Sequence, residues 1–346
     1  MRDGRADWAE SAPGRRFPSF GDVLEEIRAH VSPVAIGDAA FARLTDCASG
    51  LPAGAASHEF WIELRPHDPE RADLIFTLVP GWPPMRAMAP WCRKRPGPAA
   101  RTFGNFLDRA AAGSLADMPD WMCVELDALA GGSRLGLFAG SPRTSGFASG
   151  RKAARSLALV TGTEDSAVVE DWQSGAATVA GFVGPVRGVG SFPEREGAPL
   201  RVWAAVDEDD RTSDALERLD WEGDLDTVRA LEDAYPFKDR VFLDTDFIER
   251  RLGPVTGVER VRPGGWTEMN PGLWAERLRW AADAGWCDRD QADAWISVIG
   301  SHVVETDTGP TTLNLGVNHV KFVFGDGDPY LKLYLAGNMG RIRSAA

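Results

Sequence analysis

LNLGVNHVKFVFGDGDPYLKLYLAG, residues 313–337, contains the hairpin that decides the fold. Apolar and polar residues alternate along 313–324 and again along 330–335, which is the period of a β-strand with two different faces. Between the two runs stands Gly-Asp-Gly-Asp-Pro, residues 325–329, and these residue types favour a tight turn. The stretch therefore predicts two antiparallel strands joined by a short connection.

The same alternation occurs in four earlier pairs of segments: 58–64 with 73–79, 121–127 with 134–139, 186–192 with 200–206, and 240–247 with 257–261. Mostly helical spacing separates the pairs, so the repeating unit is a helix with a hairpin. We expect an α+β protein of repeated helix/β-hairpin units, an antiparallel sheet or barrel with helices on the outside. Closing five units into a ring gives a ten-stranded barrel, the architecture of aromatic prenyltransferases. Stopping short gives an open, curved sheet with an edge or groove.

The helices and the domain organisation follow from the segments between the hairpins. Ser19 is expected to cap the first helix, because a serine side chain accepts hydrogen bonds from the free N–H groups there. Further helices are expected through 41–47 and over 102–112, 166–174, 271–284 and 288–299, and two more are expected within 212–235, divided at Gly223. The predicted organisation is a flexible N-terminal segment at 1–18, a first helix/hairpin half at 19–140, a linker at 141–160, and a second half at 161–346 packed with the first as one globular unit.

Composition limits the classes of function. The 346 residues are 44% apolar and 26% charged, as in ordinary globular proteins, with a net charge of −13. No apolar run reaches the roughly 20 residues of a membrane span, and the N-terminus lacks a signal peptide's apolar core, so we expect a cytoplasmic protein without a membrane partner. The acidic balance disfavours nucleic acid. The four cysteines have no metal-ligand spacing and are expected to be reduced thiols.

Each predicted strand has one apolar and one polar face. Met122, Val124 and Leu126 share the apolar face of their strand, which leaves the other face polar. Antiparallel sheets commonly have one wet face, so the expectation is that water covers the polar one. In a barrel or deep groove the same side chains line the interior instead. The polar faces carry Cys123, Glu125 and Asp127; Glu63 and Arg65; Arg201 and Trp203; Asp244 and Asp246; His319 and Lys321; and Lys332 and Tyr334.

No catalytic signature marks the chain, so candidates come from the polar faces. Asp244-Thr245-Asp246 matches a DxD pattern that holds metal-bound diphosphate in some transferases, although carboxylates on a wet strand face are far commoner. His319 titrates near neutrality when unperturbed, although a structural histidine is the commoner explanation. If the protein is an enzyme, we expect metal-independent acid or base catalysis without a cofactor. The candidate residues are Glu125, Asp244, Asp246 and His319.

Thirteen tryptophans are more notable than any motif. Some belong to the core, but those on polar faces or in Pro-rich loops can form an aromatic surface for a peptide or an isoprenoid. Cationic and hydroxyl side chains on the polar faces can contact a peptide or, in a prenyltransferase, a diphosphate. The predicted binding residues are Trp61, Trp82, Trp91, Arg201, Trp203, Lys321, Lys332 and Tyr334.

Three blocks of the sequence carry a resemblance to a known family. WMCVELD (121–127), FLDTDFIERRLGPVTGVE (242–259), and LNLGVNHVKFVF (313–324) with LKLYLAG (331–337) resemble the peptide-binding proteins of crocagin biosynthesis, a bacterial ribosomal-peptide pathway. The resemblance implies that the protein binds a precursor peptide, through its leader, its core or both. It also implies a role either as a carrier or in cyclising the core.

Three functions therefore stay open at this point. The first is a peptide-binding protein that matures a ribosomal peptide, with hairpin edges available for an added strand. The second is an aromatic prenyltransferase acting on an indole or other aromatic substrate. The third is a non-catalytic scaffold that recruits other enzymes of the pathway.

Overall fold

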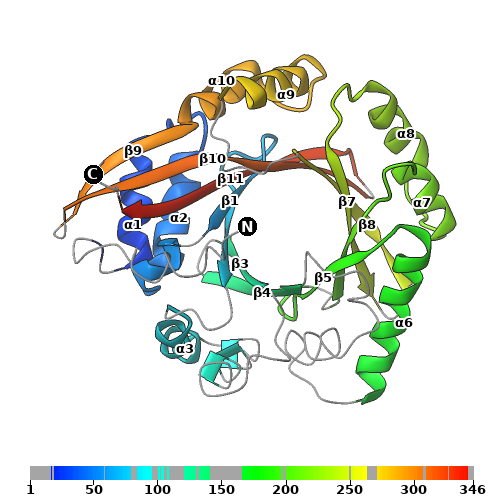
Figure 1. The fold of residues 1–346 in the computed structure, drawn as a ribbon, viewed down its shortest axis with the longest axis horizontal. Coiled ribbons are helices and arrows are strands. Elements are labelled where there is room, and N and C mark those ends of the chain that lie inside the picture. The colour runs from blue at the N-terminus through cyan, green and yellow to red at the C-terminus, as the bar shows by residue number, and fades with distance from the viewer. Residues whose placement is uncertain are drawn as a thin grey trace, which may run out of the picture.

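The computed structural model places a ring of antiparallel strands at the centre of the molecule (Figure 1). It describes residues 17, 19–57, 59–78, 84–95, 100–101, 103–104, 107–108, 121–129, 132–140, 166–195, 197, 200–248, 251–262, 271–306, 309–325 and 327–341. The strands are β1 (Phe60–Leu64), β2 (Ala72–Leu78), β3 (Trp121–Leu129), β4 (Gly132–Gly140), β5 (Val186–Ser191), β6 (Leu200–Ala205), β7 (Arg240–Ile248), β8 (Arg251–Val261), β9 (Gly300–Thr306), β10 (Gly309–Phe324) and β11 (Tyr330–Arg341).

The ring closes because β11 pairs with strands at both ends of the chain. It lies antiparallel to β1, where Tyr334 is opposite Glu63, and antiparallel to β10, where Tyr334 is opposite His319. Strands β1 to β8 follow one another as neighbours, and β10 joins β8 to β11. The result is a ten-stranded barrel, with β9 added to the outer edge of β10. The predicted α+β class is confirmed, in its closed form.

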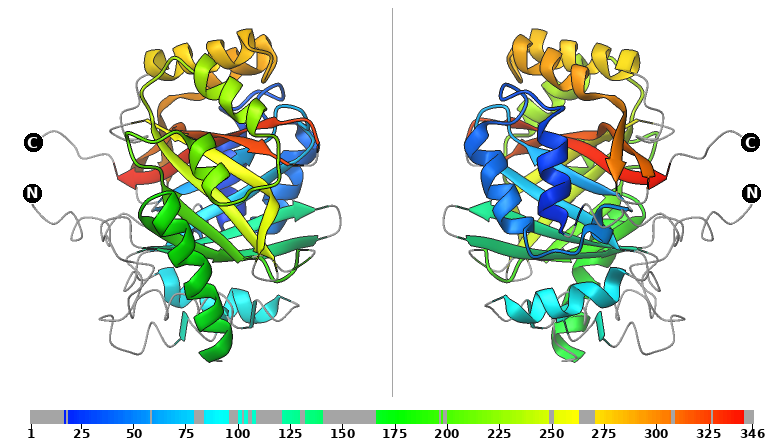
Figure 2. Two further views of the ribbon diagram at one scale, coloured as in Figure 1. Left: turned by 90° about the vertical axis from the view of Figure 1, so that its right-hand side faces the viewer. Right: turned by 90° about the vertical axis from the view of Figure 1, so that its left-hand side faces the viewer.

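Helices surround the barrel (Figures 1 and 2). The helices α1 and α2 lie on one side of the barrel, α7 and α8 lie on the opposite side, and α9 and α10 cross one edge. Among the described residues no helix is long and apolar enough to span a membrane. The described helices are α1 (Phe20–Arg28), α2 (Asp38–Ala48), α3 (Pro84–Lys94), α6 (Ser166–Phe182), α7 (Thr212–Arg218), α8 (Leu225–Ala234), α9 (Pro271–Asp283) and α10 (Arg289–Val298), with a 3₁₀ turn at Ala53–Ser57.

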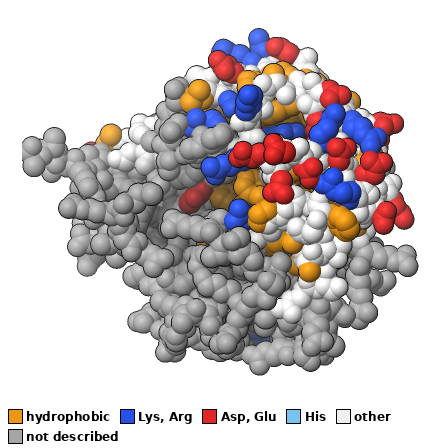
Figure 3. All heavy atoms as spheres, turned by 45° about the vertical axis from the view of Figure 1, so that its right-hand side comes forward, with side chains coloured by type: hydrophobic (Ala, Val, Ile, Leu, Met, Phe, Trp, Pro, Cys, Tyr) orange, Lys and Arg blue, Asp and Glu red, His pale blue; other side chains and the backbone are white. Residues whose placement is uncertain are grey.

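The main apolar core lies between the barrel's outer face and these helices. On β1, Phe60 and Ile62 are fully buried, and the Phe60 ring meets Phe20 of α1 edge-on with centroids 5.1 Å apart. Ser19 begins α1 as predicted, because its hydroxyl accepts the N–H of Asp22 while the Asp22 carboxylate accepts the N–H of Ser19. Outside this layer the helices are polar, and Figure 3 shows acidic and basic side chains interspersed on one described face. The apolar strand faces thus point outward, toward the helices.

This packing overturns one expectation. The polar strand faces were expected to face water, but ring closure turns them into the barrel's interior. Glu63, Asp73 and Glu125 are exposed by only 2%, 0% and 5%, and Lys321 by only 4%. An open sheet leaves such a face wet, whereas a closed barrel gives it no access to bulk water except through the ends.

Several predicted boundaries also change. Strand β9 was not predicted, because Gly300–Thr306 is short and mostly polar and sits as an extra strand beside the long β10. The Pro-rich segment expected to be a loop contains α3, in which Pro90 is tolerated inside the helix. The helix predicted over 166–174 extends to Phe182. Residues 1–16, most of 102–112 and the linker at 141–160 lie outside the described residues.

Candidate functional site

The lumen of the barrel changes character from one end to the other. Because every second side chain of a strand points inward, the inward residues can be followed in order along each strand. On β8 they run from Val261 through Glu259 to Gly257, and on β3 from Trp121 to Asp127. Cross-strand neighbours agree, since Phe242 lies opposite Glu259 and Asp244 opposite Gly257. The lumen therefore has an aromatic end, a charged middle layer and a cationic far end.

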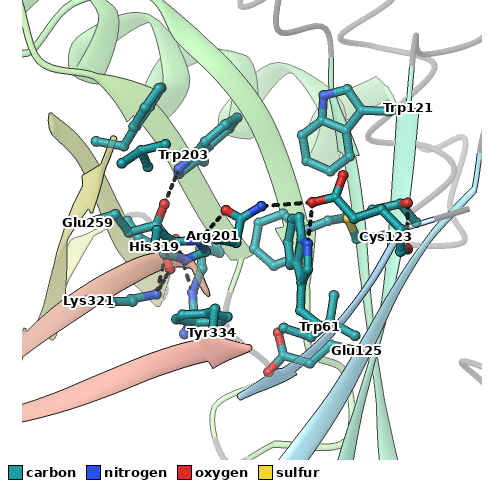
Figure 4. A pocket seen from close by; sticks show the side chains of 18 residues that line it. Trp61, Trp121, Cys123, Glu125, Arg201, Trp203, Glu259, His319, Lys321 and Tyr334 are labelled. Carbon is teal, nitrogen blue, oxygen red and sulfur yellow. Dashed lines mark hydrogen bonds and ion pairs between the residues drawn. The ribbon is translucent and has the colours of Figure 1, made fainter. Parts of the chain in front are cut away.

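A cavity of about 370 Å³ occupies the aromatic end, which we call the aromatic chamber (Figure 4). Its size is in the range of small-molecule sites. The Trp203 ring stacks on Phe242 with centroids 4.5 Å apart and meets Trp121 edge-on at 5.8 Å. The lining residues are Glu59, Trp61, Ile75, Thr77, Trp121, Cys123, Glu125, Phe138, Arg201, Trp203, Phe242, Asp244, Glu259, Val261, Asn318, His319, Lys321 and Tyr334.

Two glycines on β5 leave space for the aromatic rings of the chamber. A Cβ on Gly190 would come within 2.8 Å of the Phe138 ring, and one on Gly188 would lie 3.4 Å from Trp121. Gly190 also lies opposite Phe138 in the β4–β5 pairing. A larger residue at Gly190 would displace the ring, so the glycine sets the shape of the chamber's aromatic wall.

Glu259 is the acidic group at the floor of the chamber. Its Oε2 accepts a hydrogen bond from the indole Nε1–H of Trp203 at 2.7 Å. Its Oε1 lies 3.7 Å from Lys321 Nζ and 3.8 Å from His319 Nε2. Burial raises the pKa of Glu259 to about 7, although Lys321 opposes the rise. This carboxyl group therefore exchanges its proton near neutral pH.

Lys321 lies beside Glu259 (Figure 4) and forms a buried ion pair with Asp244. Burial alone would lower the pKa of Lys321, but Asp244 and Glu259 raise it overall, so the amine stays charged. Arg201 lies 3.5 Å from Asp244 and binds Asp246 through two hydrogen bonds of 2.5 and 2.9 Å. The two acidic residues of the DxD pattern are thus each occupied by a cation rather than free to bind a metal.

His319 stays neutral in the same layer. Its ring stacks on Tyr334 with centroids 3.9 Å apart, and burial together with Lys321 lowers its pKa to about 3. His319 Nδ1 lies 2.7 Å from the side-chain oxygen of Asn318, an arrangement in which Nδ1 carries the proton. Nε2 is then an acceptor, and it has no hydrogen-bond partner among the described residues. Glu259 and His319 therefore place two acceptor atoms 3.8 Å apart at the floor of the chamber, and Nε2 is itself buried.

Tyr334 connects this layer to the next ion pairs. Its hydroxyl donates to Glu63 at 2.6 Å, and Lys332 Nζ lies 2.8 Å from the same carboxylate. Burial lowers the pKa of Lys332, whereas the pKa of Glu63 lies well below its usual value because Lys332 and Arg65 outweigh burial. The pair is therefore held in its charged form.

Asp73, Glu125 and Asp127 place three carboxylate oxygens within 4.8 Å of one another. Such a cluster can hold a divalent cation, but here two arginines occupy it. Arg65 Nη2 lies 2.5 Å from Asp73, and Arg195 contacts both Glu125 and Asp127. The guanidinium groups already supply the positive charge and the hydrogen bonds that these carboxylates require. The cluster is explained as an ion-pair network.

The structure brings most of the predicted residues together. Glu125, Asp244, His319, Trp61, Arg201, Trp203, Lys321 and Tyr334 line the aromatic chamber. Asp246 and Lys332 lie farther along the lumen, in the cavities of the far end. Trp91 lies outside the barrel on α3, where the guanidinium of Arg95 covers its ring at 4.7 Å. Trp82 falls outside the described residues.

Sequence reasoning missed Glu259 and Arg195. Glu259 alternates with Gly257 and Val261 on β8, so the period-two rule that selected Asp244 would also have found it. Arg195 lies in the turn between β5 and β6, which was regarded only as a connection, and its side chain folds back over Phe192 at 3.7 Å to reach Glu125. No local pattern signals that return into the lumen.

Comparison with known proteins finds a similar protein among solved structures but none among family models or curated proteins. No family model matches the chain, and no curated protein matches it. Among solved structures, the crystal structure of AnaPT from Neosartorya fischeri is similar, with a TM-score of 0.49 and 10% sequence identity over 94% of this chain and 93% of that chain. No residue role is transferred from a match at this level. The family suggested by the sequence blocks stays a prediction.

Proposed function

We propose that this protein binds an indole-type aromatic group in the aromatic chamber and that Glu259 accepts a proton from it. The observation that carries the proposal is the position of Glu259, a buried carboxyl group with a pKa of about 7, at the floor of a chamber walled by aromatic rings. A general base is most effective when its pKa lies near the working pH.

The chamber's chemistry favours a flat ring with an N–H donor. The walls of Trp61, Trp121 and Phe242 offer ring faces and edges to an aromatic guest. The indole of Trp203 already donates to Glu259, so the carboxylate accepts an indole N–H within this space. Glu259 Oε1 remains as an acceptor beside the chamber, and the buried Nε2 of His319 lies 3.8 Å from it.

Both reactions expected from the sequence need such a base. Peptide cyclisation and the transfer of a prenyl group to an aromatic ring each remove a proton from the attacking substrate. In the proposed step the substrate N–H or C–H bond breaks, its electron pair stays on the substrate atom that attacks, and the proton binds the Glu259 carboxylate to give the neutral acid. Solvent takes the proton from that acid afterwards, which is favourable at neutral pH for a group of this pKa.

The charges of the lumen favour an aromatic side chain of a peptide over a prenyl diphosphate. Lys321 and Lys332 both point into the barrel, as a diphosphate site requires. Each of the predicted diphosphate contacts is already engaged, however: Lys321 by Asp244, Lys332 and Tyr334 by Glu63, and Arg201 by Asp246. A diphosphate would have to displace these buried carboxylates. The precursor peptide therefore remains the proposed source of the ring.

A titration with N-acetyltryptophanamide tests the proposal. At about 0.3 kcal/mol for each of roughly 18 non-hydrogen atoms, the expected Kd is about 0.1 mM. An N1-methylated analogue, which lacks the donor, should bind about tenfold more weakly. Affinity for the parent compound should increase as the pH rises through 7, because the ionised carboxylate is the better acceptor. Glu259→Gln should remove that pH dependence, and Glu217→Gln on the surface of α7 should retain it.

Equal affinity for the parent and methylated compounds would contradict the role of Glu259. A second arm compares indole with a tryptophan-containing tripeptide, which distinguishes a free small molecule from a peptide as the source of the ring. Tighter binding of the tripeptide supports the peptide-maturation role. Tighter binding of indole supports a small-molecule enzyme.

A further inference from the structure

The far end of the barrel has an electrostatic character opposite to that of the whole chain. A cavity of about 210 Å³ there is lined by six cationic side chains and one carboxylate, that of Asp244. An adjoining cavity of about 290 Å³ shares Arg71 and Arg195 with it and adds Arg134. We call the two together the cationic mouth. Its cations are Arg65, Arg71, Arg134, Arg195, Arg201, Lys321 and Lys332, in a chain whose net charge is −13.

Three of these cations keep hydrogen-bonding capacity. Arg71 and Arg134 are exposed, and neither forms a salt bridge with another described residue. Arg65 is only 7% exposed; its Nη2 binds Glu63 and Asp73, while its buried Nη1 has no partner among the described residues. A buried guanidinium nitrogen without an acceptor is costly, so this atom points to a missing anionic or carbonyl partner.

We propose that the cationic mouth binds the carboxylate group of a ligand. An arginine fork matches the two oxygens of a carboxylate, and Arg71 and Arg65 line the same cavity. The charge also fits. Seven carboxylates line the mouth or directly contact its cations, namely Glu63, Asp73, Glu125, Asp127, Asp244, Asp246 and Glu259, against seven cations. The mouth therefore has no large surplus of positive charge, and the exposed Arg71 and Arg134 attract the anion, which suits a monoanion better than a phosphate.

The site is separate from the aromatic chamber. Arg201, Asp244 and Lys321 line both spaces and form the layer between them. Along β11 the division is visible in one strand, since Tyr334 lines the chamber and Lys332 and Tyr330 line the mouth. The barrel thus offers an apolar ring site from one end and a carboxylate site from the other. Binding at the mouth does not depend on the role proposed for Glu259.

Paired probes test this assignment. Acetyl-triglycine with a free C-terminal carboxylate, and its amidated twin, are titrated against the full-length protein by saturation-transfer NMR. The free acid should bind and the amide should bind at least about fivefold more weakly, because the amide carries no charge. Arg71→Gln and Arg134→Gln, both at exposed positions and therefore safe for folding, should each weaken the free acid about threefold or more. Arg279→Gln on the outer surface of α9 should leave its affinity unchanged.

Further arms distinguish the possible ligands. If acetate competes as well as the peptide, any small carboxylate fills the site; if the peptide is much the tighter ligand, a chain end fills it. Equal binding of acid and amide, or indifference to both mouth arginines, would overturn the proposal. Competition by inorganic phosphate at lower concentrations than acetate would overturn the choice of a monoanion. Glu259→Gln serves as an internal check, because its loss of indole binding should leave carboxylate binding intact.

Discussion

Gly257 is the position at which a single methyl group should disturb the charged layer most. An alanine Cβ there would lie 2.1 Å from Lys321 Cε, far inside the distance of any normal contact. A lysine end is flexible and usually moves aside cheaply. Here it is held by the buried ion pair with Asp244, so moving aside means giving up that pair.

The size of the effect follows from this geometry. Separating a buried ion pair so that one charge is left without a partner costs about 3–5 kcal/mol. The lower end, about 3 kcal/mol, applies here because Arg201 stays 3.5 Å from Asp244 and Glu259 stays 3.7 Å from Lys321. Against this, alanine in place of glycine stabilises by about 0.4–1 kcal/mol where the backbone permits it. Gly257→Ala should therefore lower the free energy of unfolding by about 2–3 kcal/mol, measured by urea denaturation. Gly132→Ala, whose Cβ meets nothing within 4 Å, should change it by less than about 0.5 kcal/mol.

A double-mutant cycle makes the reasoning refutable. Lys321→Ala alone should be destabilising, because Asp244 loses its nearer cation and keeps only Arg201, 3.5 Å away. In that background the obstructing atom is gone, so adding Gly257→Ala should be neutral or stabilising by up to about 1 kcal/mol. If Gly257→Ala still costs more than about 2 kcal/mol without the lysine, the clash with Lys321 is not the cause and the explanation fails.

Three further outcomes are expected. Folding raises the pKa of Glu259 from 4.5 to about 7, so between these values the folded protein holds a proton that the unfolded chain has released. The protonated Glu259 therefore stabilises the folded state fully below pH 4.5. This stabilisation declines by about 2–3 kcal/mol as the pH rises to 7. Between pH 4.5 and 7, urea denaturation should show a smaller decline in the free energy of unfolding for Glu259→Gln than for the unsubstituted protein. Equal declines would argue against the raised pKa of Glu259. Gly190→Ala should cost about 1–3 kcal/mol through overlap with Phe138, whereas Gly188→Ala, with contacts of 3.4 Å or more, should cost less than about 0.5 kcal/mol; similar effects at both sites would exclude steric overlap. Ser19→Ala should cost about 1 kcal/mol in thermal or urea unfolding through loss of the helix cap, and an unchanged midpoint would mean that the cap adds nothing.

Period-two alternation predicted more of the site than of the fold. It placed Glu63 with Arg65, Asp244 with Asp246, and His319 with Lys321 on common faces. These residues line the lumen or, in the case of Glu63, contact Lys332 and Tyr334 that line it. It could not decide whether the faces were wet, because closure depends on β11 pairing with β1, which joins Tyr334 to Glu63 across most of the chain. Strand period carries no information about the shear of a barrel or about its last pairing.

The ion pairs of the lumen are better explained by function than by stability. Buried pairs gain little over well-packed apolar residues, since desolvation offsets most of their attraction. A barrel selected for stability alone would fill its interior with branched apolar side chains, yet this lumen has alternating cations and carboxylates from Arg201 and Lys321 to Arg65 and Arg195. Their arrangement keeps Lys321 charged, His319 neutral and Glu259 near its titration point within a few ångströms of one another. Such divided protonation states within one layer are what acid and base chemistry requires, and this is why the lumen is the proposed site.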